Sequence, residues 1–224
     1  MSVSKNLVRI EKNIKKACLN SGRHVEDVKI IAVTKYASIQ RTQEAVDAGL
    51  HHFGENREEG LLEKYEGINQ DVHWHFIGSL QTRKVKNIIE KVRYIHSLDR
   101  MSLAKEIHKR SKKPISCFVQ VNVSGEESKH GLAPENVVDF IKELQPYSNI
   151  IVEGLMTMAP HISNEDRLRT YFQSLRKVQR TVQNLQLTYA PCKELSMGMS
   201  NDYEIAIEEG ATFVRIGTAL VGDE

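Results

Sequence analysis

The sequence predicts an α/β fold, a single (β/α)8 TIM barrel with an extra N-terminal helix before its first strand. Eight short apolar runs typical of buried strands alternate with segments of helical periodicity, which number eight when that first helix is included. No linker rich in proline, glycine or serine interrupts them, and 224 residues is a common size for one such barrel. We therefore expect one domain over residues 1–224, with an open doubly wound sheet as the alternative fold.

The predicted elements begin with a helix over residues 3–20, in which Leu7, Ile10 and Ile14 share an apolar face and after which Gly22 ends the helix. Residues 29–36 then form a continuous β-branched and aliphatic run, typical of a strand that is buried on both faces. The later apolar runs predict strands over residues 51–56, 73–80, 94–98, 115–123, 150–158, 194–200 and 213–220.

Capping residues, prolines and glycines mark the helices between these strands. Ser38 is suited to cap a helix that Gly49 ends, and Pro134 suits the first turn of another helix. Ser163 with Asp166 resembles a capping box. The predicted helices cover residues 38–48, the segment after Asn56 to about Tyr65, and residues 82–92, 99–112, 134–144, 163–185 and 202–209.

Composition narrows the class of partner. The 31 basic and 29 acidic residues give a net charge of +2 and are spread along the chain, which argues against a nucleic-acid surface but not against a local anion site. Cys18, Cys117 and Cys192 are far apart and odd in number, so neither a disulfide framework nor a zinc knuckle is indicated. With no signal peptide and no apolar span, we expect a cytoplasmic protein that does not bind membranes.

Lys35 stands at the end of the first predicted strand. Active sites of TIM barrels lie where the strands end. We expect partial desolvation there to make the free amine available as a nucleophile for Schiff-base chemistry. For Lys35 taken alone, a side chain that simply extends into water is the simpler interpretation.

The ends of the last two strands predict an anion site. A period of two places Ser196, Gly198 and Ser200 on the inner face of strand 194–200 and the methionines between them on the outer face. Ser200 precedes a predicted helix, whose free N–H groups favour an anion, although a plain N-cap is the alternative role. Gly217 and Thr218 end the neighbouring strand and add backbone N–H groups and a hydroxyl.

Arg215 lies one pleat below Gly217 and therefore points into the barrel. Its guanidinium needs an acceptor, either a core carboxylate or the ring nitrogen of a ligand. Pyridoxal 5′-phosphate (PLP) has parts that match the whole set. Its aldehyde suits Lys35, its pyridine nitrogen suits Arg215, and its phosphate suits Ser200, Gly217 and Thr218.

Several stretches then strongly resemble the pyridoxal phosphate homeostasis proteins, along essentially the whole chain. They are Ala32-Val33-Thr34-Lys35, Gly54-Glu55-Asn56, Trp74-His75-Phe76-Ile77-Gly78, Leu80-Gln81, Ser128-Lys129-His130-Gly131, Gly154-Leu155-Met156, Leu195-Ser196-Met197-Gly198-Met199-Ser200 and Val214-Arg215-Ile216-Gly217. The family looks like the barrel domain of alanine racemase standing alone. The resemblance implies a Schiff base at Lys35, phosphate contacts at Ser200, Gly217 and Thr218, Arg215 at the pyridine nitrogen and Asn56 near the ring oxygen.

The resemblance also implies a carrier and not an enzyme. Members of the family bind PLP, influence the cellular balance of vitamin B6 and of amino and keto acids, and have no established turnover. A racemase needs two bases, and Lys35 supplies only one. We therefore expect a monomeric PLP carrier that hands its cofactor to apo-enzymes.

Two other functions remain open from the residues. One is a PLP-dependent racemase or lyase, in which Tyr36 or His75 acts as the second base. The other is metal-dependent hydrolysis, because His73 and His75 share a strand face at a spacing that suits zinc, although they lie at the beginning of their strand. We also expect Met156 and Met158 to pack in or under the pocket, and Lys129 to be a solvated loop lysine.

Overall fold

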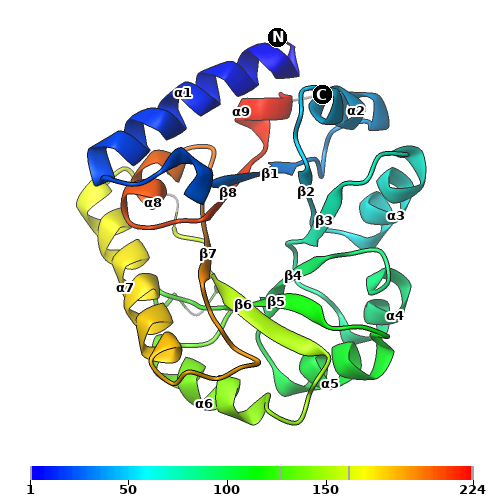
Figure 1. The fold of residues 1–224 in the computed structure, drawn as a ribbon, viewed down its shortest axis with the longest axis vertical. Helices are drawn as coiled ribbons and strands as arrows, with labels where there is room; N and C mark the ends of the chain where they lie inside the picture. The colour runs from blue at the N-terminus through cyan, green and yellow to red at the C-terminus, as the bar shows by residue number, and fades with distance from the viewer. Residues whose placement is uncertain (1, 127, 161, 223–224) are drawn as a thin grey trace.

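The chain folds into a closed parallel barrel whose strands follow one another in sequence order (Figure 1). The computed structural model describes residues 2–126, 128–160 and 162–222, so Met1 and Glu224, the ends of the predicted domain, lie outside the described residues. The strands are β1 (Lys29–Val33), β2 (His52–Glu55), β3 (His73–Phe76), β4 (Tyr94–Leu98), β5 (Ile115–Gln120), β6 (Ile150–Met156), β7 (Glu194–Met199) and β8 (Phe213–Ile216). Because β1 pairs in parallel with both β2 and β8, the ring is closed. The predicted TIM barrel is confirmed, and the open sheet is excluded.

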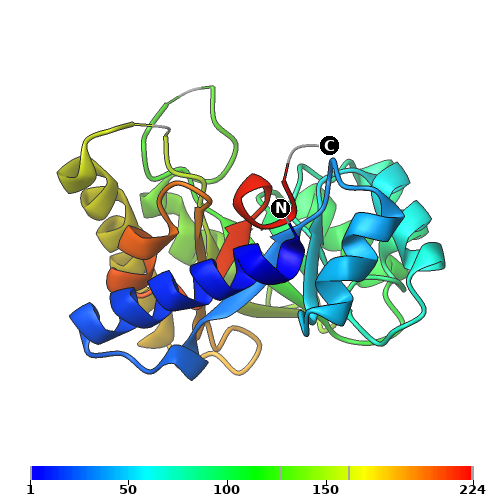
Figure 2. The ribbon, with the colours of Figure 1, turned by 90° about the horizontal axis from the view of Figure 1, so that it is seen from above.

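Helices surround the barrel on its outer side (Figures 1 and 2). They are α1 (Val3–Ser21), α2 (Ile39–Asp47), α3 (Glu58–Gly67), α4 (Val85–Ile88), α5 (Met101–Arg110), α6 (Val137–Glu143), α7 (Glu165–Gln183), α8 (Tyr203–Glu208) and α9 (Thr218–Val221), with short 3-10 helices η1 (Val25–Asp27), η2 (Thr82–Lys84) and η3 (Pro134–Asn136). The extra N-terminal helix is α1, which packs along α8 and α9. No helix within the described ranges combines the length and the apolar character that a membrane crossing requires.

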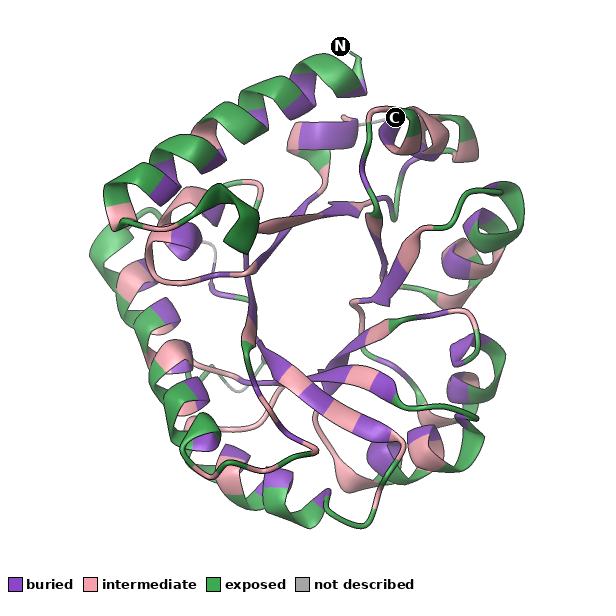
Figure 3. Cartoon of the chain, in the orientation of Figure 1, coloured by how far each residue is buried: buried purple, intermediate pink, exposed green. Residues whose placement is uncertain are grey.

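Two apolar cores hold the barrel together. The larger one lies between strands and helices and includes the predicted face of α1 with Leu7, Ile10 and Ile14. The smaller one fills the inside of the barrel and contains Ile31, Phe118, Met156 and Phe213. Figure 3 shows the strands largely buried and the outer faces of the helices exposed. Because side chains fill the interior of a TIM barrel, a ligand is held at the strand ends and not in a central pore.

Seven of the eight strands are shorter than predicted, and only β4 keeps its predicted bounds. β3 ends at Phe76 and not at Leu80, and β5 ends at Gln120 and not at Val123. β1 ends at Val33, because the chain turns there and the Ala37 N–H donates to the carbonyl of Thr34 over 2.8 Å. β8 ends at Ile216, and the predicted strand residues 218–220 belong instead to α9. An apolar run does not show where the hydrogen-bonded ladder stops, so the sequence pattern extended these strands too far.

Three predicted helices also begin differently. Asn164 caps α7, since its side chain accepts the Arg167 N–H over 2.9 Å, and Ser163 lies outside the helix. The segment predicted as one helix over residues 82–92 forms η2 followed by the short α4, and the one predicted over residues 134–144 forms η3 followed by α6. None of these differences changes the order of elements around the barrel.

Candidate functional site

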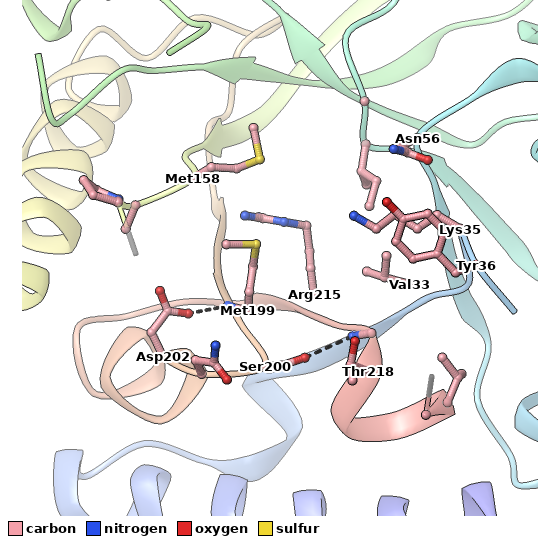
Figure 4. A pocket seen from close by; sticks show the side chains of 18 residues that line it. Val33, Lys35, Tyr36, Asn56, Met158, Met199, Ser200, Asp202, Arg215 and Thr218 are labelled. Atoms are coloured by element: carbon pink, nitrogen blue, oxygen red, sulfur yellow. Dashed lines mark hydrogen bonds between the residues drawn. The ribbon is translucent and has the colours of Figure 1, made fainter. Parts of the chain in front are cut away.

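A cavity of about 400 Å³ lies at the C-terminal ends of the strands, with walls from the ends of β1, β2, β7 and β8. Its lining includes all six residues selected from the sequence, namely Lys35, Asn56, Ser200, Arg215, Gly217 and Thr218. Figure 4 shows Lys35, Tyr36 and Asn56 on one side of the cavity, Met158 and Met199 on the other, and the Arg215 side chain between them. Residues from distant parts of the chain therefore meet where TIM barrels hold their ligands.

Lys35 lies in the turn that follows β1. The turn is anchored one residue earlier, because the buried Thr34 hydroxyl donates to Glu55 Oε1 over 2.6 Å. The same oxygen lies 3.1 Å from Lys64 Nζ. The side chain of Lys35 is exposed, and its Nζ lies 4.9 Å from the centroid of the Tyr36 ring. The prediction that burial desolvates this amine is therefore wrong, and the amine is open to an incoming aldehyde.

Arg215 points from β8 into the barrel and is only 4% exposed. Its Nη1 donates to Ser196 Oγ over 2.7 Å and its Nη2 donates to the Thr157 carbonyl over 2.8 Å. Burial lowers the pKa of the guanidinium to about 10, so Arg215 remains a cation at neutral pH. A guanidinium has about five N–H donors, and these two bonds leave the others for a ligand. The hydrogen-bond partners of Arg215 are therefore a hydroxyl and a carbonyl. The core carboxylate that the sequence left open as its acceptor is not among them.

Ser200 and the start of α9 face each other at the rim of the cavity. The Gly217 N–H donates to Ser200 Oγ over 3.3 Å (Figure 4). The first N–H groups of a helix have no intrahelical acceptors, so those at the start of α9 are donors for a ligand. With the hydroxyls of Ser200 and Thr218 they form a set suited to a phosphate. The alternative role of Ser200 as a plain N-cap does not occur, because α8 begins at Tyr203.

β7 breaks the predicted alternation of faces where it approaches the cavity. Its register with β8 shifts after Ser196. Gly198 has a φ of +89°, and a Cβ at this position would lie 2.5 Å from Ala206 Cβ in α8. Position 198 therefore faces the helix layer, and Met199 lines the cavity. The prediction that Gly198 faces inward and Met199 faces the helices is wrong, because a bulge adds a residue to the strand without any change in its apolar pattern.

Asn56 follows β2 directly and is half-buried on the cavity wall. The segment after β3 lies against its backbone, since a Cβ on Gly78 would be only 2.2 Å from the Asn56 carbonyl oxygen. Only glycine permits this approach. Ile77 lines the same wall. The Asn56 side chain therefore offers an amide on the Lys35 side of the cavity (Figure 4).

Comparison with known proteins places the chain among relatives along its full length. The family model for the N-terminal domain of alanine racemase matches residues 6–224. A pyridoxal phosphate homeostasis protein of Aquifex aeolicus is 43% identical over 227 residues, which cover 100% of this chain and 99% of that protein. The chain belongs to the pyridoxal phosphate homeostasis protein family. A further member, from Pseudomonas aeruginosa, is 36% identical over 99% of this chain and 95% of its own length.

Solved structures agree with membership of the pyridoxal phosphate homeostasis protein family. The PipY protein of Synechococcus elongatus, solved with PLP bound, is 29% identical and superposes with a TM-score of 0.83 over 98% of this chain and 100% of its own. An alanine racemase of Clostridium difficile is 16% identical, with a TM-score of 0.76 over 98% of this chain and 56% of that one. The second likeness shows the shared barrel fold alone.

Tyr36 and His75, the two residues considered as the second base of a racemase, lie in different places. Tyr36 lines the cavity and is 73% exposed. His75 is fully buried inside the barrel, and its ring nitrogens lie 2.9 Å from ring nitrogens of His52 and His96. His75 is therefore not placed to reach a substrate at the strand ends. Within the described residues there is also no group of three or more His, Cys, Asp or Glu side chains that could hold a metal ion.

Sequence reasoning missed several residues around the site. Thr157 holds Arg215 through its carbonyl, and Met199 lines the cavity. Ser196 was placed on the inner face, but its contact with Arg215 was not predicted. Met158 also lines it and Met156 lies in the interior core, as the expectation that they pack in or under the pocket required. The signal that could have found Thr157 was its place at the end of an apolar strand, beside two methionines assigned to the pocket.

Proposed function

We propose that the chain binds PLP in this cavity through a Schiff base between its aldehyde and Lys35. The observation that carries the proposal is the meeting, in one cavity, of an accessible lysine amine with a buried guanidinium and the open N-terminus of α9. These groups fit the aldehyde, the ring nitrogen and the phosphate of one molecule. The cavity volume of about 400 Å³ falls within the range of small-molecule sites.

Each residue selected from the sequence has a part in this proposal. Ser200, Gly217 and Thr218 contact the phosphate, where the N-terminus of α9 adds a favourable dipole. Arg215 donates to the pyridine nitrogen. Asn56 lies near the ring oxygen. PLP supplies a reactive aldehyde and an electron-accepting ring when bound.

We propose that residues 1–224 form one PLP-binding domain that carries and buffers the cofactor and so contributes to vitamin B6 and amino and keto acid homeostasis, without catalytic turnover. Arg215 supports a carrier, because a guanidinium donates to the pyridine nitrogen and disfavours its protonation, which leaves the ring a weaker electron sink. The buried surroundings of Arg215 strengthen this effect. Relatives that bear the name pyridoxal phosphate homeostasis protein support the same role.

The setting of this carrier is also a proposal. We expect a cytoplasmic monomer that passes PLP to apo-enzymes. The three cysteines are free and buried, which suits a reducing compartment. The open mouth of the cavity, with Tyr36, Met158 and Met199 partly exposed at its edge, suits transfer to another protein.

The binding proposal is tested by mixing cofactor-free protein with PLP and recording the visible spectrum before and after borohydride reduction. We expect an absorption band near-stoichiometric with protein, bleached by borohydride, with the reduced adduct located at Lys35 by peptide mass. Lys35→Ala removes the band, whereas Lys129→Ala, which changes a loop lysine outside this cavity, keeps it. A wild-type protein that stays colourless, or an adduct on another lysine, contradicts the proposal.

A PLP-dependent racemase or lyase is the second candidate, favoured by one observation, the place of Tyr36 on the cavity wall beside Lys35. Incubation of PLP-loaded protein with single-enantiomer amino acids in heavy water tests it. The carrier proposal predicts no exchange of the α-proton above that of free PLP. Exchange at an enzymatic rate that Tyr36→Phe abolishes would establish the second candidate instead.

A further inference from the structure

A continuous chain of hydrogen-bonded side chains crosses the interior of the barrel and ends at Arg215. Arg215 Nη1 lies 2.7 Å from Ser196 Oγ, which lies 3.0 Å from His96 Nδ1. His96 Nε2 lies 2.9 Å from His75 Nδ1, and His75 Nε2 lies 2.9 Å from His52 Nδ1. These five residues come from β8, β7, β4, β3 and β2. The chain thus connects the Arg215 wall of the cavity with a half-buried histidine at the N-terminal end of β2.

The residues in the middle of this hydrogen-bonded chain are shielded from solvent. Ser196, His75 and His96 are 0% exposed. The His75 ring stacks on Tyr94 with centroids 4.3 Å apart, and the His96 ring stacks on Phe118 with centroids 4.2 Å apart. Burial lowers the pKa of both imidazoles well below 6.5, and for His96 the nearby Arg215 cation adds to the effect. Both rings are therefore neutral near pH 7, and a neutral imidazole has one donor nitrogen and one acceptor nitrogen.

Arg215 fixes the direction of every bond in the chain. A guanidinium only donates, so Ser196 Oγ accepts from Arg215. Among the described residues, Ser196 Oγ makes its other hydrogen bond with His96 Nδ1. The serine hydroxyl therefore donates its proton to Nδ1, because a buried hydroxyl without an acceptor is costly. His96 then carries its proton on Nε2 and donates to His75. By the same argument His75 carries its proton on Nε2 and donates to His52.

We propose that Ser196, His96, His75 and His52 are positioning residues for Arg215, a one-directional chain that keeps an acceptor under the guanidinium and aims its remaining N–H groups at the ring nitrogen of the cofactor. The inference rests on the proposed function for the identity of that ligand. A neutral chain of fixed direction stabilises the Arg215 cation, whereas a proton added to the chain would repel it. The Thr157 carbonyl holds the second Nη atom, so the plane of the guanidinium is set at two points.

The direction of the chain is tested without cofactor, by NMR of the ring nitrogens in 15N-histidine-labelled protein. We expect His75 and His96 to carry a proton on Nε2 alone from about pH 6 to about pH 8. Ser196→Ala, which separates Arg215 from the chain, is expected to shift both sets of nitrogen resonances. A wild-type His96 protonated on Nδ1, or a doubly protonated ring at neutral pH, would overturn the proposal.

The positioning role is tested with the cofactor, in a chain-breaking variant and a matched control. His75→Phe keeps an aromatic ring against Tyr94 but removes both hydrogen bonds, whereas Tyr94→Phe keeps the same stack and leaves the chain intact. We expect His75→Phe to weaken PLP binding about tenfold and to change the visible spectrum of the bound cofactor. Tyr94→Phe is expected to match the wild type in both.

Stability is measured in parallel, because a merely structural role would lower the melting temperature without any change in the spectrum of bound PLP. If His75→Phe does not fold, His52→Phe interrupts the same chain at its half-buried end and is judged by the same affinity and spectrum. Wild-type affinity and spectrum in a folded chain-breaking variant would refute the positioning role. A wild-type protein that does not bind PLP would instead refute the proposed function. The NMR result would still decide the direction of the hydrogen bonds between Arg215 and His52.

Discussion

Lys64 and Glu55 form an ion pair inside the protein, with Nζ 3.1 Å from Oε1 and side chains only 5% and 1% exposed. Thr34 donates to the same carboxylate oxygen over 2.6 Å. The pair joins α3 to the end of β2, and through Thr34 it holds the turn that presents Lys35. A buried charge that loses its partner is far more costly than the pair itself.

We therefore predict that Glu55→Gln lowers the free energy of unfolding by about 3–5 kcal/mol, because the Lys64 ammonium is left buried without a counter-charge. The double variant Glu55→Gln with Lys64→Met is expected to regain a large part of that loss. Urea denaturation measures both. As a control, Lys142→Met breaks an exposed pair with Asp139, at 3.8 Å, and should change stability by less than about 0.5 kcal/mol. Equal effects of Glu55→Gln and Lys142→Met would contradict the prediction.

Gly198 is predicted to tolerate no side chain. Its φ of +89° disfavours any L-residue, and a Cβ there would lie 2.5 Å from Ala206 Cβ and 3.0 Å from Tyr203 Cα. Gly198→Ala should destabilise the protein by about 3 kcal/mol through backbone strain and overpacking together. Gly125 is the matched control, since its φ of +70° carries the strain but no atom of the described residues lies within 4 Å of an added Cβ. Thermal melts of the two variants should differ clearly, and the idea fails if they coincide.

The bulge at Gly198 also shows where prediction from sequence reaches its limit. Apolar runs of strand length identify β1 to β8, because a parallel strand that is buried on both faces needs apolar side chains at successive positions. Five of the six residues proposed for the site follow, because the ends of neighbouring strands meet at one rim, whereas Asn56 was implied only by the family resemblance. A bulge, however, changes which residues face inward without changing the apolar pattern, so the orientation of Met199 was not predictable.

The hydrogen bonds among the three histidines could not be predicted from the sequence for a related reason. His52, His75 and His96 lie on three different strands, and they meet only because the register pairs His52 with His73 and His75 with Tyr94. No local pattern in the sequence carries that register. Taken alone, the spacing of His73 and His75 suits a metal site, although two such histidines in a half-buried strand are usually packed side chains. The buried contacts of His75 decide between these interpretations, and these contacts exist only in three dimensions.

Stability should fall as the pH falls below about 6.5, the pKa of an unfolded histidine. Burial holds the pKa of His75 and His96 far below that value in the folded state, so below about pH 6.5 the unfolded chain binds protons that the folded chain does not. The free energy of unfolding therefore rises with pH up to this value and levels off above it. Each such histidine contributes a slope of up to about 1.4 kcal/mol per pH unit.

Urea titrations at about pH 5.5, 6.5 and 7.5 measure this slope in a range where carboxylates scarcely titrate. His52 adds to the slope with the same sign, because burial lowers its pKa to about 4. His75→Phe should reduce the slope of the free energy of unfolding against pH, because one of the buried histidines that contribute to it is removed. A free energy of unfolding that does not change over this range would show that these rings are protonated in the folded protein.

The three cysteines should be unreactive in the folded protein. Cys18, Cys117 and Cys192 are at most 1% exposed, and burial raises the pKa of each thiol, to about 12 for Cys192. Because the thiolate is the nucleophile, almost none of the reactive form is present at pH 8. We expect a thiol reagent such as dithiobis-nitrobenzoate to modify less than one cysteine per folded chain and all three after denaturation in urea. Rapid modification of Cys192 in the native protein would mean that the loop before β7 opens on the timescale of the reaction, since only such opening exposes its sulfur.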